Sequence, residues 1–232
     1  MAPAMPRLSF WTGQILHATG LALLLLLSGG AWAAIAPLSG EFLGIGSDGW
    51  FWAALAAPVA HQTYVWICWR LELVHSKAVS RTIGFGRYRA VFFILIAGRL
   101  VAFVPLAWAN RDSLTLPLPA RLVLGSLLLV PSAYAMHSVV RYFGMSRAAG
   151  ADHFDERYRK MPLVSEGIFR WTSNGMYGVA FLGPWGLALM LGSAGALIAA
   201  AFGHAYVWLH YCATERPDME FIYGQTQHAS SG

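Results

Sequence analysis

Polar side chains that can bind a charged ligand or accept a proton gather in four short stretches of this 232-residue chain, each beside an apolar run. Carboxylate and imidazole groups accept protons, and a guanidinium can hold a carboxylate through two parallel hydrogen bonds. If the fold brings the stretches together, they would hold a water-soluble cofactor beside a lipid co-substrate. They are His75, Ser80 and Arg81; Asp152, His153, Asp155 and Glu156; Arg170, Asn174 and Tyr177; and Glu215, Arg216 and Asp218.

Each of these residues taken singly also fits a simpler interpretation. Charged residues that flank membrane spans are commonly interface anchors and topology signals. Asn174 and Tyr177 would then be a helix N-cap and an interfacial aromatic residue. Only their arrangement relative to one another can distinguish a site from a set of anchors.

The composition is that of a membrane protein. Hydrophobic residues make up 57% of the chain and charged residues 12%, against about 25% in soluble domains, and the mean hydropathy is +0.51. The net charge of +5 is spread between apolar runs, which favours a topology signal over nucleic-acid binding. Cys68 and Cys212 lie at the ends of different apolar segments, so the sequence predicts neither a disulfide framework nor a thiolate metal cluster.

The apolar runs predict an all-α, polytopic transmembrane helical bundle of about six spans. A spanning helix needs about 20 mainly apolar residues. A long C-terminal tract, interrupted at 192–195 by Gly-Ser-Ala-Gly, predicts a hairpin of two close-packed helices. The other four predicted spans cover approximately 9–35, 49–69, 90–110 and 121–143, and the hairpin covers 176–212.

The basic residues predict the orientation of the bundle. With a cytoplasmic N-terminus, 13 of the 16 Lys and Arg residues face the cytoplasm, and so do the four polar stretches. Arg111 and Arg121 face outward, whereas Arg99 falls within the third apolar run, where it must snorkel, pair or line a cavity. With a composition typical of bacteria, we expect an inner-membrane protein with its site on the cytoplasmic side.

The first span has two interpretations. Arg7, the apolar run 21–27 and Ala31-Trp32-Ala33 also have the order of a cleavable signal peptide. We favour a retained helix, and removal of this segment would leave the orientation of the other five spans unchanged.

Two segments resemble the phospholipid and isoprenylcysteine methyltransferase superfamily of integral membrane enzymes. The first runs from Gly167 to Tyr177 and is similar to the family pattern of Gly, an aromatic residue, Arg, His or Asn, Pro, any residue and Tyr. The second is Glu-Arg-Pro-Asp at 215–218 with Tyr-Gly at 223–224. Asn174 in place of His, and the stretch 75–84 with its His, Ser-Arg and Gly, favour the phosphatidylethanolamine N-methyltransferase branch.

The chain also departs from the family pattern. Gly175 stands where the family has Pro, Arg216 replaces one of two paired acidic residues, and 130–132 read Val-Pro-Ser where one branch has Gly-x-Gly. These departures weaken the assignment of the substrate more than the resemblance to the superfamily.

The resemblance implies methyl transfer from S-adenosylmethionine to a lipid or lipophilic acceptor in the bilayer, most readily a phospholipid amine. Such an amine is mostly protonated at neutral pH, by analogy with Lys at about 10.4, so a base or a desolvating pocket is needed. The resemblance implies His75, Asp152 and His153 as candidate catalytic residues, and Arg170, Asn174, Tyr177 and Glu215 as cofactor-binding residues. It also implies three parts of the chain, namely two N-terminal spans in 1–74, a methyltransferase-like core in 75–224 and a polar tail in 225–232.

Other functions stay open at this point. An isoprenoid carboxyl group is an alternative methyl acceptor, and membrane steroid reductases have a similar terminal core. Histidines within predicted spans can also hold haem or relay protons; here these are His17, His61, His137, His204 and His210.

Overall fold

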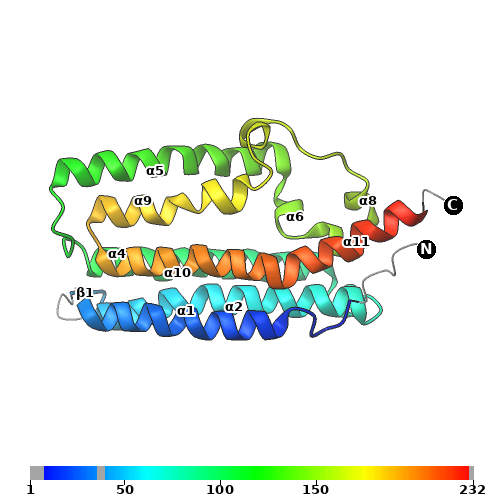
Figure 1. The fold of residues 1–232 in the computed structure, drawn as a ribbon, viewed down its shortest axis with the longest axis horizontal. Helices are drawn as coiled ribbons and strands as arrows, with labels where there is room; N and C mark the ends of the chain where they lie inside the picture. Colours follow the sequence, from blue (N-terminus) through cyan, green and yellow to red (C-terminus); the bar gives the residue numbers. More distant parts are fainter. Residues whose placement is uncertain (1–7, 36–39, 230–232) are drawn as a thin grey trace.

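Six helices form the body of the computed structural model, which describes residues 8–35 and 40–229. They run side by side along the long axis of the molecule (Figure 1). These helices are α1 (Gln14–Ile35), α2 (Ser47–Val74), α4 (Gly84–Ala109), α5 (Leu118–Ser138), α9 (Leu182–Leu191) and α10 (Ala194–His210).

Short elements close the two ends of the bundle. At one end, β1 (Glu41–Phe42) pairs antiparallel with β2 (Ile45–Gly46). At the other end lie a 3₁₀ turn and several short helices (Figure 1). These are α3 (Ala78–Thr82), α6 (Met145–Ala148), α7 (Ala151–Phe154), α8 (Glu156–Arg159), the 3₁₀ turn η3 (Gly167–Arg170) and α11 (Arg216–Ala229).

The predicted all-α membrane bundle is confirmed. Within the described residues, four helices are long and apolar enough to cross a membrane, and Gly175–Leu191 forms a shorter apolar helix. The 28-residue α2 is long enough to span but is not among the four. The four are Gln14–Ile35, Gly84–Ala109, Leu118–Phe143 and Ala194–Gly224.

The predicted C-terminal hairpin is present, and its turn has a clear chemical basis. Gly192 has φ +64, a left-handed conformation that favours glycine, and it ends α9. The hydroxyl of Ser193 accepts the backbone N–H of Ala196 and so caps α10. Asn110, at the end of α4, accepts the N–H of Gly195, which ties the turn to the rest of the bundle.

Glycines also set the spacing of α5 and α9. A Cβ on Gly125 would meet Met190 and the carbonyl oxygen of Gly186, while one on Gly186 would meet the carbonyl oxygen of Gly125. Small residues that face each other in this way let two membrane helices approach closely.

The end of the hairpin differs from the prediction. The helix does not stop near Cys212 but continues through the π-helical segment η5 (Tyr211–Glu215) into α11, which reaches Ala229. Glu215 therefore lies inside a continuous helix rather than at a helix C-terminus. Helical backbone also occupies most of the region predicted as a polar tail.

The described basic residues divide between the two ends as predicted. The end of the bundle that carries α3, α6 to α8 and α11, called the basic end below, holds most of them (Figure 1). Arg111 and Arg121 lie at the opposite end, where Arg121 pairs with Asp112 at 2.7 Å. Arg7 lies outside the described residues.

Cysteine labelling tests the orientation that this division implies. In a Cys212→Ser background, we expect Thr115→Cys to react with a membrane-impermeant thiol reagent on intact cells. Glu156→Cys should react only after permeabilisation, since Thr115 and Glu156 are exposed at opposite ends. Labelling in the reverse pattern would overturn the assignment of the basic end to the cytoplasm.

Candidate functional site

A fully buried ion pair joins α2 to α11 at the basic end. Nε of Arg70 lies 2.7 Å from Oδ1 of Asp218, and neither side chain is exposed. The Arg70 guanidinium also donates to the carbonyl oxygens of Ser9, at 2.7 Å, and Thr214, at 3.4 Å. One side chain therefore holds together the segment before α1, the end of α2 and the α10–α11 helix.

His153 of α7 extends this pair into a network. Its Nδ1 lies 3.2 Å from Oδ1 of Asp152, and its Nε2 lies 3.4 Å from Oδ2 of Asp218. The phenol of Tyr223 donates to the other carboxylate oxygen of Asp152 at 3.1 Å. The network thus carries two carboxylates, an arginine and a histidine.

The backbone and one aromatic ring fix the position of His153. The imidazole stacks on Trp69 with ring centroids 3.9 Å apart and planes at 19°. Gly150 precedes α7 with φ +76, and a Cβ there would collide with the Trp69 ring. Glycine at 150 therefore satisfies both the left-handed turn and the close approach of Trp69.

The network sets the protonation states of its members. Burial lowers the pKa of His153, but hydrogen bonds and charge from Asp152 and Asp218 outweigh it and raise the pKa to about 9. Burial raises the pKa of Asp152, and hydrogen bonds from His153 and Tyr223 overcome that effect and leave it below its ordinary value. At neutral pH, His153 is a cation and Asp152 an anion.

A second polar pair lies next to this network. The phenol of Tyr177 donates to Oε2 of Glu215 at 2.5 Å. Glu215 is close enough to His153, Asp152 and Asp218 to interact with all three electrostatically. Both residues lie on π-helical segments, Tyr177 on η4 (Gly175–Ala180) and Glu215 on η5, and such segments occur often at functional sites.

The predicted site residues separate into two groups. Asp152, His153, Tyr177 and Glu215 come together, although they derive from three distant parts of the sequence. His75, Arg170 and Asn174 do not join this group: all three are exposed, and the ring of His75 faces Phe10, with centroids 6.1 Å apart.

Sequence reasoning missed three residues of the network. Arg70 is one of the 13 basic residues whose positions indicate only the topology, although the structure buries it fully. Trp69 carries no chemical signal of its own, and the sequence offers Tyr223 only as part of the second family-like motif, without a role in the site. The available clue was Asp218, the last residue of the Glu-Arg-Pro-Asp motif, because an acidic residue buried beside a helix needs a cationic partner.

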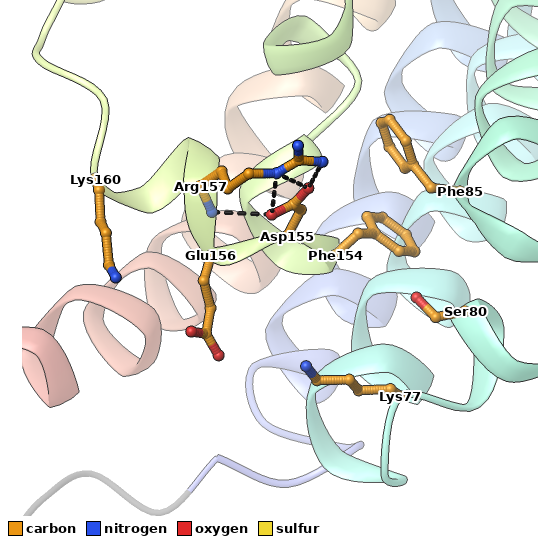
Figure 2. A pocket seen from close by; sticks show the side chains of 8 residues that line it. All are labelled: Lys77, Ser80, Phe85, Phe154, Asp155, Glu156, Arg157 and Lys160. Carbon is orange, nitrogen blue, oxygen red and sulfur yellow. Dashed lines mark hydrogen bonds and ion pairs between the residues drawn. The ribbon is translucent and has the colours of Figure 1, made fainter.

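An open pocket of about 720 Å³ lies beside this network at the basic end. Phe85 and Phe154, with ring centroids 5.1 Å apart, form one wall, and Asp155 and Arg157 pair at 2.7 Å along another (Figure 2). Phe154 directly follows His153, so the pocket is next to the buried network. None of the seven predicted site residues lines the pocket; it is lined by Lys77, Ser80, Phe85, Phe154, Asp155, Glu156, Arg157 and Lys160.

Two of the histidines within predicted spans form side-chain hydrogen bonds, whereas the buried ring nitrogens of His61 and His210 have no hydrogen-bond partner within the described residues. His17 bonds to Gln14 at 3.0 Å and to the hydroxyl of Tyr206 at 2.9 Å, and His204 accepts from Trp185 at 3.2 Å. Across residues 8–35 and 40–229 there is no cluster of three or more His, Cys, Asp or Glu residues suited to a metal ion.

Comparison with known proteins supports the predicted family over the C-terminal half. A family model described as phospholipid methyltransferase matches residues 120–226. The chain is 29% identical over 118 residues to a phosphatidylethanolamine N-methyltransferase of Clavispora lusitaniae, a match that covers 48% of this chain and 13% of that protein. A protein of the same name from Malassezia globosa is 28% identical over 152 residues, covering 65% of this chain and 16% of the relative.

These findings confirm the resemblance to the phosphatidylethanolamine N-methyltransferase-like branch of the superfamily. The matches span less than a fifth of the length of either relative. No solved structure matches the chain. Residues 120–226 contain Asp152, His153, Tyr177, Glu215 and Asp218, whereas Trp69 and Arg70 lie outside the matched region.

The protonation of His153 predicts a pH-dependent stability. Its folded-state pKa of about 9 exceeds the ordinary value of 6.5. The contribution of His153 to the free energy of unfolding is therefore complete below pH 6.5 and is lost as the pH rises through 9. The loss is on the order of 3 kcal/mol. We expect the thermal unfolding midpoint in detergent to decrease as the pH is raised from 6.5 to 9.5. His153→Gln should remove most of that decrease.

His75→Gln is the matched control for this experiment, since His75 is exposed and makes no ion pair within the described part of the chain. Its stability curve should parallel that of the parent. If His153→Gln also runs parallel to the parent, His153 is not held as a cation in the folded protein.

Proposed function

We propose that the chain is an integral membrane methyltransferase that transfers a methyl group from S-adenosylmethionine to the amine of a phospholipid. The observation that carries this proposal is the placement of Tyr177 and Glu215 beside the Asp152–His153–Asp218 network. That arrangement lies in the region similar to phospholipid methyltransferases, and two relatives in yeasts are named for phosphatidylethanolamine.

The residues at this site suit the proposed methyl donor. S-adenosylmethionine supplies a methyl group on a sulfonium and also carries an amine, a carboxylate and ribose hydroxyls. The Glu215 carboxylate has one oxygen bonded to Tyr177 and a second oxygen able to accept from an amine or a hydroxyl. The negative charge of Asp152 favours a cationic ligand at this position.

Asp152 is the proposed proton acceptor for the lipid amine. Its carboxylate is ionised at neutral pH and partly accessible, with 22% of the side chain exposed. His153 is already protonated at that pH and is buried, so it orients and stabilises Asp152 rather than taking a proton itself. No nucleophilic side chain is required, because removing water and aligning the two reactants lowers the barrier to a displacement.

The other predicted site residues and the location of the protein also belong to this proposal. Arg170 and Asn174 are exposed near the start of η4, where they would meet the donor only at its outer edge, and His75 is exposed beside Phe10. Residues 75–224 are proposed as the catalytic core. The proposed location is a bacterial inner membrane with the basic end in the cytoplasm; composition supports this location, whereas the relatives named above come from yeasts.

Replacement of Glu215 tests the donor assignment. Glu215→Gln keeps the size of the side chain and removes its charge. A charge-assisted hydrogen bond contributes about 1.5 to 3 kcal/mol, so the affinity for S-adenosylmethionine, measured by calorimetry in detergent, should weaken by roughly 10- to 150-fold.

Arg216→Ala is the adjacent control. Arg216 is exposed and pairs with Glu220 at 3.0 Å on the same helix, an interaction that contributes little to a binding site. We expect its donor affinity to equal that of the parent. Parent-like binding by Glu215→Gln together with weakened binding by Arg216→Ala would contradict the assignment at the acidic motif.

A further inference from the structure

Arg99 is a charged residue at mid-depth in the membrane. It lies ten residues from Arg89, which bonds to Ser146 of α6 at the basic end, and ten residues from Ala109, the last residue of α4. At 1.5 Å per residue, it is about 15 Å from each. Together these distances match the hydrocarbon thickness of a bilayer, about 30 Å.

The protein compensates the Arg99 charge only in part. The guanidinium lies 5.2 Å from the centre of the Phe181 ring, just before α9, and a Cβ added to Gly203 of α10 would lie 3.9 Å from its Nη2. Within residues 8–35 and 40–229, no carboxylate forms an ion pair with Arg99. A charge at this depth without an anion is costly, and such residues commonly mark functional positions.

The side chain lies beside the proposed site. Helical side chains lean toward the N-terminus of their helix, which for α4 is the basic end. Arg99 is close enough to Tyr177 to interact with it electrostatically, and Tyr177 bonds to Glu215. The guanidinium therefore lies on the membrane side of the Tyr177–Glu215 pair.

We propose that Arg99 binds an oxyanion of a reactant at the junction of α4, α9 and α10. This inference rests on the proposed function. Two reactants carry such a group: the acceptor lipid has a phosphodiester and the donor has a carboxylate. Arg99 is partly exposed and lies within a helix long and apolar enough to cross a membrane, so we assign the phosphodiester of a lipid that enters from the bilayer as the anion.

Arg99→Met tests the proposal without a large risk of misfolding, because replacing a charge at this depth with an apolar residue suits the bilayer. The acceptor measurement is the KM for phosphatidylethanolamine in mixed micelles at saturating S-adenosylmethionine. The donor measurement is the Kd of S-adenosylmethionine without lipid. We expect the KM to rise roughly 10- to 150-fold, as for loss of a charge-assisted hydrogen bond, with the donor Kd unchanged.

Arg99→Lys should fall between the parent and Arg99→Met, since it keeps the charge but loses the forked geometry. Arg111→Met is the matched control: this exposed arginine contacts Trp108 at the opposite end and should leave both measurements unchanged. A weakened donor Kd with unchanged KM would keep the oxyanion site and assign it to the donor carboxylate. Parent-like values of both for Arg99→Met would overturn the proposal.

The same variants separate this proposal from the proposed function. If the parent protein neither transfers a methyl group nor binds the donor, that result contradicts the proposed function but not the Arg99 proposal. Arg99 would then be tested by native mass spectrometry of phospholipid bound to the detergent-purified protein. Loss of bound lipid in Arg99→Met but not in Arg111→Met would support the oxyanion site, and equal retention in both would refute it.

Discussion

The buried ion pair between Arg70 and Asp218 is the constraint on which the basic end depends. Both side chains are fully excluded from solvent, so loss of either partner would leave an uncompensated buried charge, a cost of about 3 to 5 kcal/mol. Asp218 also faces His153, and the Arg70 guanidinium holds the segment before α1 and the last turn before Glu215. The pair thus fixes the α10–α11 helix against α2 and α7 at once.

The membrane explains why polar chemistry concentrates at this end. Backbone groups within the bilayer must be satisfied internally, which restricts the spans to helices. Departures from regular α-helix occur in η2 (Val139–Phe143), η4 and η5, and the last two carry Tyr177 and Glu215. The wider π-helical turns alter the register of side chains at the point where the spans meet the polar network.

Arg70 and Arg99 have different roles in this molecule. Arg70 pairs with the carboxylate of Asp218 and stabilises the arrangement of helices. Arg99 has an aromatic ring and tyrosines around it instead, which leaves its charge available to a ligand. The difference lies in the neighbouring helices and not in the residue type or in its local sequence.

The amino-acid sequence by itself determined the all-α membrane fold, the C-terminal hairpin and the resemblance to phospholipid methyltransferases, because span length, glycine position and short motifs are local features. It also indicated that Asp152, His153, Tyr177 and Glu215 share one side of the membrane. Only the tertiary structure decided that these four lie together while His75, Arg170 and Asn174 are exposed, and that Arg70 is buried against Asp218. The physical reason is that topology assigns a residue to a side of the bilayer, whereas contact and burial depend on helix rotation and packing, which are set by distant partners such as Trp69 and Gly150.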